Sequence, residues 1–443
     1  MSATEVTNGS PSWLAHFGMF PNPSQVRADD MTYLEDNSIY GPVSDWATDF
    51  DHADPEYNKN AHAIWDQLRG TCPVAHTNRY GGTWLPTTHE FVHEIAYDTD
   101  HFSSRGVVVA TVKPSDNPDA PPAPIGGAPP ITSDPPFHQH ARKILLPAFA
   151  PPVINEWEPE VRKLCRDLIA GMSKDDVVDA AVQYAQHIPV NVIARMLGFP
   201  PEDGELFRGF VHNVLEAINL EPGARIQAFQ ELDAYIAKQV QDHIDNPRDD
   251  LTNFLLNAKI FDNPLSPQHV GGTIILLLIA GIDTTWSAIG SSLWHLATNP
   301  VDRRRLVDNP QLMPMAIEEF LRAYAPVTMA RVVKEDFEFH GVEMKQHDWV
   351  LLPFPAANRD PAEWEDADKV IIDREVNRHA AFGLGIHRCL GSNLARLELR
   401  VAVEEFLAAF PDFELAPDEV VKWSVGQIRG PRELPVRITG RAG

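Results

Sequence analysis

A long apolar segment, Pro267 to Asn299, constrains the fold of this 443-residue chain more than any other feature. Ser266 is a good N-cap, Pro267 suits the first helical turn, and Pro300 ends the pattern. About thirty residues, each rising ~1.5 Å, predict a helical rod of roughly 50 Å. The middle of this rod is apolar all round, so it must run through the interior with other elements packed around it.

The rest of the chain predicts a mainly α protein with small β-sheets. Length alone suggests about three domains, but residues 1–45 are polar and contain Pro and Gly, which favours a loosely packed N-terminal arm. We expect a single domain over residues 46–443. Helical patterns cover 137–300 and 301–326, and strand-like runs follow at 331–335, 337–339, 350–353 and 421–439.

The segment from Val107 to Pro136 is dense in proline. Its Pro-Pro pairs rule out a helix or a central strand. A long ordered loop inside a compact domain is often a lid or a binding loop. The alternative is a disordered surface insert.

Charge and cysteine content limit the classes of partner. The formal net charge of −25 argues against nucleic acid and against binding to anionic membranes. The most apolar run, residues 273–282, is too short to cross a bilayer, and residues 1–10 lack the apolar core of a secretion signal. Cys72, Cys165 and Cys389 lie far apart and are odd in number, which fits reduced thiols. We expect a soluble cytoplasmic protein.

Cys389 lies in a glycine-rich loop directly ahead of a predicted helix, Ser392 to about Phe410. A helix N-terminus supplies the positive potential that keeps a thiolate ionised. Gly385 and Gly391 remove side chains where a flat ligand would press on the backbone. A metal here would have one protein ligand, since no second cysteine lies nearby, and this describes haem better than zinc. The alternative is a buried cysteine in a tight turn.

The spacing Phe-x-x-Gly-x-His-x-Cys-x-Gly at residues 382–391 resembles the haem-binding loop of the cytochrome P450 superfamily, the haem-thiolate monooxygenases. The resemblance runs from roughly residue 135 to residue 435. It implies the triangular, prism-like P450 fold, with haem b between the long helix and the helix after the cysteine. Cys389 would be the axial iron ligand. Phe382, Gly383 and Gly391 would contact the haem.

Residues 280–285 of the long helix read Ala-Gly-Ile-Asp-Thr-Thr and interrupt its apolar pattern. Glycine in a helix interior costs about 1 kcal/mol relative to alanine, and a buried acid is costly unless it is paired. Thr284 can bond back to a carbonyl and open the helix. A helix kink with a solvated acid is therefore one interpretation.

The same run resembles the oxygen-activation motif of the P450 family. By that resemblance, Ala280 and Gly281 would lie against the haem. Thr284 would hold a water or the activated oxygen, and Asp283 would relay protons to it.

Glu319 and Arg322 lie three residues apart on one helix face. Such a pair is by default a surface salt bridge worth roughly a few tenths of a kcal/mol. The pattern also resembles the buried Glu-x-x-Arg pair of the P450 family, whose third member would here be Arg374. Glu318 lacks an arginine three residues later, because that position is Leu321. By the resemblance, the trio is a scaffold for the cysteine loop and not catalytic.

The propionates of haem need cationic partners when they are buried. Singly, a histidine or arginine is best explained as a surface charge. As a set, four residues at matching family positions predict the propionate ligands: His138, Arg142, Arg331 and His387.

The resemblance also outlines a substrate pocket. Its walls would be the lid (residues 107–131), the helix segment 277–280, residues 327–329 and the turn 425–428. The candidate pocket residues are Leu277, Val327, Thr328, Met329 and Gln427. These segments are mainly apolar, so a hydrophobic small molecule is the expected substrate. Trp286, a bulky residue just past the threonine pair, is unusual.

Electrons must come from another protein, because no Gly-x-Gly-x-x-Gly dinucleotide site follows a strand and no FMN-type domain is evident. A ferredoxin or flavodoxin with its NAD(P)H-dependent reductase is implied, with O2 as co-substrate. Such donors are acidic, and Arg388, Arg396 and Arg400 form a candidate docking patch. Ordinary solvated arginines are the alternative.

Two other functions compete with a monooxygenase. A peroxide-driven or isomerising haem-thiolate enzyme needs no external electrons, but the intact pair Asp283 and Thr284 argues against it. A non-enzymatic haem-binding sensor would not need a proton relay.

Overall fold

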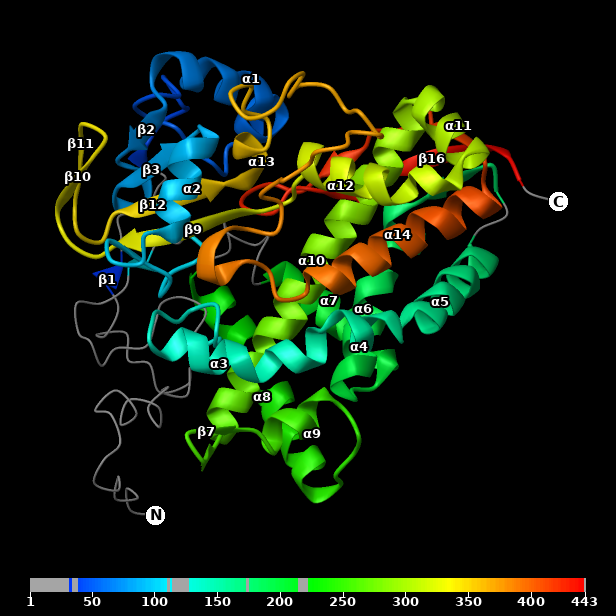
Figure 1. The fold of residues 1–443 in the computed structure, drawn as a ribbon, viewed down its shortest axis with the longest axis horizontal. Helices are drawn as coiled ribbons and strands as arrows, with labels where there is room; N and C mark the ends of the chain where they lie inside the picture. The colour runs from blue at the N-terminus through cyan, green and yellow to red at the C-terminus, as the bar shows by residue number, and fades with distance from the viewer. Residues whose placement is uncertain are drawn as a thin grey trace.

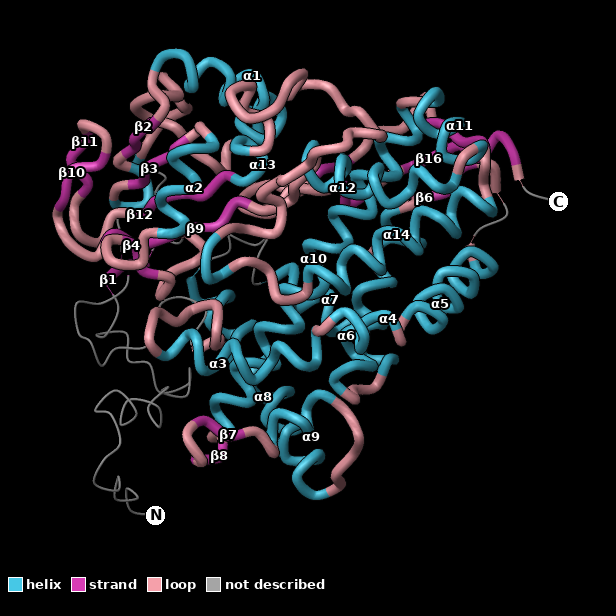
Figure 2. Tube along the Cα trace, in the orientation of Figure 1, coloured by secondary structure: helices cyan, strands magenta, loops and turns pink. Residues whose placement is uncertain are grey.

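The structure is a computed structural model that describes residues 32–33, 39–109, 112–113, 127–172, 175–213 and 222–441. The predicted arm over residues 1–45 and the middle of the proline-rich segment lie mostly outside the described residues. Helices make up most of the molecule, and the largest sheet lies at one corner (Figures 1 and 2). The expectation of a mainly α protein with small sheets is confirmed.

Most of the predicted helical regions form helices, broken by short turns. Gly198, in a left-handed conformation with φ of 72°, ends one of them. The α-helices are α1 (Pro55–Thr71), α2 (His89–Tyr97), α3 (Phe137–Leu145), α4 (Pro151–Asn155), α5 (Glu158–Gly171), α6 (His187–Leu197), α7 (Gly204–Val211), α8 (Pro222–Asp245), α9 (Leu251–Leu256), α10 (Pro267–Thr298), α11 (Pro300–Asp308), α12 (Met313–Ala323), α13 (Phe354–Ala357) and α14 (Ser392–Ala409).

The central helix α10 is the predicted rod, ending one residue earlier than expected. Ser266 caps it by accepting a hydrogen bond from the backbone N–H of His269 at 3.1 Å. It passes through the middle of the molecule and packs against α6, α8 and α14 (Figure 1). By length and composition α10 could span a bilayer, contrary to the argument from the short run 273–282, but 72% of its most apolar window is buried by protein. Burial, not length, therefore marks α10 as a core helix.

The five-stranded sheet brings together segments from both halves of the chain. Its strands, in spatial order, are β2 (Val74–Thr77), β3 (Thr83–Pro86), β12 (Trp349–Pro353), β9 (Thr328–Val333) and β4 (Phe102–Ser103). Strands β12 and β3 are parallel, and the other neighbours are antiparallel. The strand expected at 331–335 begins earlier, at Thr328, and ends at Val333.

The remaining strands form small antiparallel sheets, as expected for the C-terminal region. A three-stranded sheet has the order β13 (Asp412–Leu415), β16 (Pro435–Gly440) and β6 (Val177–Asp179). Two-stranded sheets pair β1 (Thr32–Tyr33) with β5 (Val112–Lys113), β7 (Lys259–Ile260) with β8 (Asn263–Pro264), β10 (Phe337–Phe339) with β11 (Val342–Met344), and β14 (Lys422–Trp423) with β15 (Pro431–Glu433). Strand β15 packs directly against α10.

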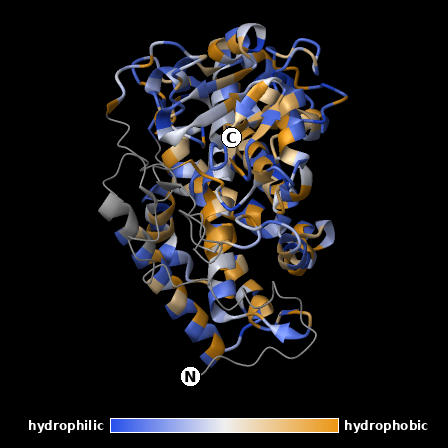
Figure 3. Cartoon of the chain, turned by 90° about the vertical axis from the view of Figure 1, so that its left-hand side faces the viewer, coloured by the Kyte–Doolittle hydropathy of each residue, from blue (hydrophilic) through white to orange (hydrophobic). Residues whose placement is uncertain are grey.

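The largest core cluster surrounds α10 and includes apolar residues of α5, α6 and α14. Along the outer helices, hydrophobic and hydrophilic residues alternate (Figure 3), as expected of helices that bury one face. The end of the proline-rich segment packs on the same core. A Cβ on Gly272 would lie 1.9 Å from the carbonyl oxygen of Gly127, and Thr273 donates a hydrogen bond to the carbonyl of Pro129 at 3.2 Å.

Candidate active site

A cavity lies between α10 and the cysteine loop. One wall carries Ala280, Gly281 and Thr284, and the other carries Phe382, Gly383 and Cys389. These residues are far apart in the sequence, so the cavity exists only because α14 and its preceding loop pack across the middle of α10. The structure thus places the predicted haem contacts around one space.

Cys389 is a free thiol at the cavity wall. Its backbone N–H donates to the carbonyl of Phe382 at 2.6 Å, which closes the loop, and Gly383 adopts the left-handed φ of 71° that the loop requires. Burial raises the pKa of Cys389, whereas a hydrogen bond from the backbone of Gly391 and three nearby arginines act in the opposite direction. A bound cation would deprotonate such a thiol.

Gly385 has a different role from the one expected of it. Its φ is 65°, and a Cβ there would lie 2.4 Å from the carbonyl oxygen of Ala96 in α2. Glycine is needed so that the loop can pack on α2, and the expectation that Gly385 makes room for a ligand is wrong. Gly391, in contrast, lines the cavity and has no atom within 4 Å of an added Cβ.

A cluster of two histidines and an arginine lies at one end of the cavity. His138 of α3 is 1% exposed and Arg331 of β9 is 5% exposed. The rings of His138 and His387 lie 4.1 Å apart. Burial, reinforced by neighbouring arginines, lowers the pKa of His138 to about 4 and also lowers that of His387. Burial lowers the pKa of Arg331 to about 10.

This cluster has spare hydrogen-bonding groups. Among the described residues, both ring nitrogens of His138 and the Nε2 of His387 have no hydrogen-bond partner. Arg331 donates from Nη1 to the adjacent carbonyl of Ala330 at 2.8 Å. Buried donors without acceptors are costly, and a group of them beside an arginine fits an anion. Together with one thiol and an apolar slot, the cluster fits haem with its carboxylates.

Arg142 lines the cavity, but its Nη2 donates to the backbone carbonyl of Arg388. Its guanidinium therefore braces the cysteine loop in this structure. Burial lowers the pKa of Arg142. Its role toward a propionate stays a prediction.

The predicted oxygen-activation residues are split between the cavity and the protein interior. Thr284 lines the cavity, and its Oγ1 donates to the carbonyl of Ala280 at 2.9 Å, the back-bond that the sequence suggested. Asp283 is fully buried, and its Oδ1 lies 2.7 Å from Nη2 of Arg432. The alternative of a solvated acid is therefore wrong, and Asp283 faces a guanidinium that the sequence did not point to.

The Glu319 cluster is buried rather than superficial. Glu319 and Arg322 have no exposed side-chain surface, and their carboxylate and guanidinium meet in two bonds of 2.8 Å. Arg374 adds a bond from Nε at 3.1 Å, and the backbone N–H of Ile371 adds one at 2.8 Å. Arg322 also donates to the carbonyls of three residues in the meander that leads to the cysteine loop: Asn358, Ala367 and Lys369.

Glu318, which the sequence analysis set aside, also holds this region together. It accepts from Arg396 of α14 at 2.6 Å and lies 3.1 Å from the ring of His379. Arg396 additionally stacks on Phe382 of the cysteine loop, with 4.4 Å between the guanidinium carbon and the ring centroid. Of the two adjacent acids of α12, Glu319 holds the segment before the cysteine loop, and Glu318 contacts both that segment and the helix after the loop.

The proposed docking arginines are therefore not equivalent. Arg396 is paired with Glu318, and Arg400 is paired with Glu158 of α5 at 2.6 Å. Arg388 is exposed. Arg396 and Arg400 are only partly exposed, so Arg388 is the most exposed of the three.

The candidate pocket residues all line the cavity: Leu277, Val327, Thr328, Met329 and Gln427. The Gln427 side chain is engaged with the protein itself. Its Oε1 accepts from the backbone N–H of Val109 at 2.6 Å, and its Nε2 donates to the carbonyl of Thr328 at 2.8 Å. Gln427 therefore connects the first residues of the proline-rich segment to Thr328, the first residue of β9.

Glu398 is an acid on the cavity wall that the sequence analysis missed. It is 2% exposed, and burial raises its pKa to about 8. The signal was present, because Glu398 lies one helical turn after Leu394 on the apolar face of α14.

The pKa of Glu398 gives a pH-dependent stability. Its folded-state pKa of about 8 exceeds the ~4.3 of an exposed glutamate. Between these two pH values the carboxyl group is ionised in the unfolded chain but still protonated in the folded protein. The unfolded state is therefore increasingly favoured, and the free energy of unfolding falls as pH rises. Glu398→Gln should remove this loss, and its melting temperature should fall less than that of the native holoprotein between about pH 5 and about pH 8. The exposed Glu419→Gln is the control, and parallel curves for Glu398→Gln and the native protein would contradict the assignment.

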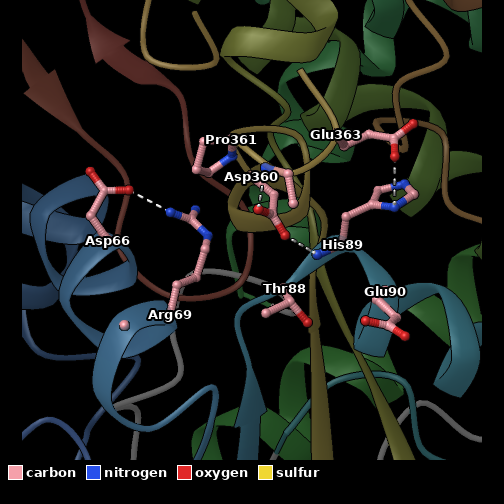
Figure 4. Close-up of a pocket in the computed structure, with 10 residues that line it drawn as sticks. Asp66, Arg69, Thr88, His89, Glu90, Asp360, Pro361 and Glu363 are labelled. Carbon is pink, nitrogen blue, oxygen red and sulfur yellow. Dashed lines mark hydrogen bonds and ion pairs between the residues drawn. The ribbon is translucent and has the colours of Figure 1, made fainter. Parts of the chain in front are cut away.

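A second cavity lies at the surface beside α1 and α2 and is lined by polar residues (Figure 4). Arg69 pairs with Asp66, and the ring of His89 lies 3.9 Å from Glu363. The backbone N–H of His89 donates to Asp360 at 2.8 Å. These groups are engaged with one another, as in a structural ion-pair cluster.

Comparisons with known proteins agree with this site. The family model of cytochrome P450 matches residues 204–427. The chain is 32% identical to mycinamicin IV hydroxylase/epoxidase of Micromonospora griseorubida, over 84% of this chain and 94% of the relative. It is 34% identical to vitamin D(3) 25-hydroxylase of Pseudonocardia autotrophica, over 87% and 95%. A cytochrome P450 of Bacillus megaterium solved with testosterone superposes with a TM-score of 0.78 at 28% identity, covering 87% of this chain and 99% of that one.

The fold and the cavity are those of a haem-dependent oxygenase, and the chain belongs to the cytochrome P450 family. It is a P450 monooxygenase, and its cofactor is haem b. The fold expected from the resemblance is confirmed.

Proposed function

We propose that this P450 inserts one atom of O2 into a hydrophobic small molecule, with electrons from a ferredoxin or flavodoxin and its NAD(P)H-dependent reductase. The observation that carries the proposal is the cavity in which the free thiol of Cys389 faces the hydroxyl-bearing turn of Thr284 across an apolar space. Residues 46–443 act as one domain in the cytoplasm, where the three cysteines stay reduced.

When bound through the Cys389 thiolate, haem supplies the activation of O2 and the transfer of oxygen. His138, Arg331 and His387 would hold its carboxylates, with Arg142 beside them. Gly281 and Ala280 of α10 would support it from one wall of the cavity, and Phe382, Gly383 and Gly391 from the other. The spare donors at His138 and His387 are the support for this orientation.

Thr284 and Asp283 deliver protons to the cavity. Because the Thr284 hydroxyl donates its hydrogen to the Ala280 carbonyl, its oxygen is left as an acceptor toward the cavity. It can hold a water or another proton donor there. Asp283, the preceding residue, takes up protons and passes them toward this hydroxyl, which is general-acid assistance.

The apolar walls select the substrate. Leu277, Val327 and Met329 present hydrophobic side chains, and the polar amide of Gln427 is already occupied by backbone partners. A hydrophobic substrate gives up few hydrogen bonds to water when it enters such an apolar pocket, so its binding is favoured. The relatives named for mycinamicin IV and vitamin D(3) are the starting points for a substrate screen.

An acidic electron donor would dock where Arg388 is exposed beside the cysteine loop. The deciding experiment compares product formation with the donor, reductase and NAD(P)H against product formation with hydrogen peroxide alone. Turnover that needs the donor system supports the proposal. Equal or faster turnover with peroxide would make the peroxide-driven alternative correct.

Thr284→Ala should raise the hydrogen peroxide released per electron consumed, by about tenfold or more, because a positioned proton-transfer group contributes about 10²–10⁴-fold. The matched control is Thr298→Ala, because Thr298 lies on the same helix and makes the same kind of back-bond, to Trp294 at 3.0 Å. Peroxide and NAD(P)H are measured together. Unchanged coupling in Thr284→Ala would remove this residue from the proton path.

A further inference from the structure

Arg432 of β15 reaches across to α10 and contacts three of its residues. Its Nη2 lies 2.7 Å from Oδ1 of Asp283, and its Nη1 donates to Oγ of Ser287 at 3.0 Å. Its guanidinium carbon lies 4.4 Å from the ring centroid of Trp286. The bulky residue that looked unusual beside the threonine pair thus serves as a platform for a cation.

The backbone is shaped to allow this approach. A Cβ on Gly430 would lie 2.3 Å from the Cβ of Ser287, so no other residue fits there without displacement. On the next turn of α10, a Cβ on Gly290 would be 3.3 Å from Pro431. Strand β15 is therefore held against α10 near the turns that carry Asp283 and Ser287.

The contact places a positive charge next to the buried carboxylate of Asp283. This carboxylate is fully buried, and the Arg432 side chain is only 13% exposed. An isolated buried carboxylate is strongly unfavourable and takes up a proton, whereas one paired with a guanidinium stays ionised. Thr284, the next residue, faces the cavity.

We propose that Arg432 is a positioning residue of the monooxygenase reaction. It keeps the Asp283 carboxylate ionised and fixed behind Thr284, so that each proton passed toward the Thr284 hydroxyl is followed by uptake of another. This inference rests on the proton role proposed above for Asp283 and Thr284. In each step the ionised Asp283 carboxylate takes up a proton from solvent and passes it to the acceptor held at Thr284, which returns the carboxylate to its ionised state; no electrons move.

The test uses Arg432→Gln in the haem-loaded protein, because glutamine keeps a donor for Ser287 and removes the charge. We expect NAD(P)H consumption in air to slow by about 10²-fold, the low end of what a positioned proton-transfer group contributes. Arg432→Lys should restore most of the rate. Arg437→Gln is the matched control, since Arg437 on β16, the next strand along the chain, forms an exposed pair with Glu414 at 3.8 Å.

A second readout does not depend on activity. The infrared spectrum of Arg432→Gln near neutral pH should gain the carbonyl band of a neutral carboxylic acid. That band should be missing from the double variant Asp283→Asn/Arg432→Gln. In kinetics, Arg432→Gln should add no further slowing in the Asp283→Asn background, because both changes act on one proton path.

The failures can be told apart. Normal NAD(P)H consumption in Asp283→Asn would overturn the proton role of Asp283. Two results would overturn the inference about Arg432 alone. One is slow NAD(P)H consumption in Asp283→Asn with a normal rate in Arg432→Gln. The other is the absence of a new carboxylic acid band from the infrared spectrum of Arg432→Gln. If Arg432→Gln does not fold, the double variant should restore folding, since it buries no unpaired charge. If the double variant also fails to fold, Asp283 is not the buried group whose charge Arg432 balances, and the inference is contradicted.

Discussion

Cys389→Ser is expected to abolish the long-wavelength Soret band of the ferrous carbon monoxide complex, together with all substrate oxidation. A cysteine thiolate that binds haem iron donates electron density to it and favours cleavage of the O–O bond. A serine hydroxyl is far less acidic than a thiol, and the buried cavity disfavours the charged form of either group. The measurements are the carbon monoxide difference spectrum and product formation per haem.

The matched control is Cys72→Ser. Cys72 caps α1, and its thiol lies 3.5 Å from the carbonyl of Val74, a contact that a hydroxyl can keep. This variant should give the native spectrum. A long-wavelength band that survives in Cys389→Ser would show that another group binds the iron.

Glu319→Ala is expected to lower the free energy of unfolding by about 3–5 kcal/mol, the usual effect of removing one partner of a buried ion pair. Arg322 would keep its charge with no exposed surface, and the backbone N–H of Ile371 and the Arg374 side chain would lose their acceptor. Because these residues anchor the segment before the cysteine loop, little folded holoprotein should be recovered. The measurements are denaturant unfolding and haem content per chain.

An exposed ion pair supplies the comparison for Glu319. Glu343 pairs with Lys345 at 3.4 Å, with 79% of the Glu343 side chain exposed. Glu343→Ala should change the free energy of unfolding by less than about 1 kcal/mol. A native yield and haem content in Glu319→Ala would mean that the cluster does not organise the loop.

Contiguous motifs explain why much of the site could be predicted. Cys389, Thr284 and Glu319 each belong to a short spacing whose chemistry is visible in the sequence. The structure places the first two on one cavity and buries the third. The long helix was also predictable, because its cap and its all-round apolar pattern are local. The catalytic roles themselves stay predictions.

Contacts between distant segments were not predictable. The carbonyl of Ala96 dictates glycine at position 385, and nothing near residue 385 signals that approach. Arg432 meets Asp283 only because two glycines let β15 reach α10. The sequence showed no partner for Arg396 or Arg400, but the structure pairs them with glutamates on α12 and α5. In each case the partner is set by packing, not by local pattern.

The central claim is the bond between the Cys389 sulfur and the haem iron. X-ray absorption at the iron edge of the purified, haem-loaded protein tests it most directly, because sulfur and lighter neighbours scatter differently. One sulfur in the first coordination shell of the native protein, and none in Cys389→Ser, is the predicted result. A shell of nitrogen and oxygen alone in the native protein would contradict the account.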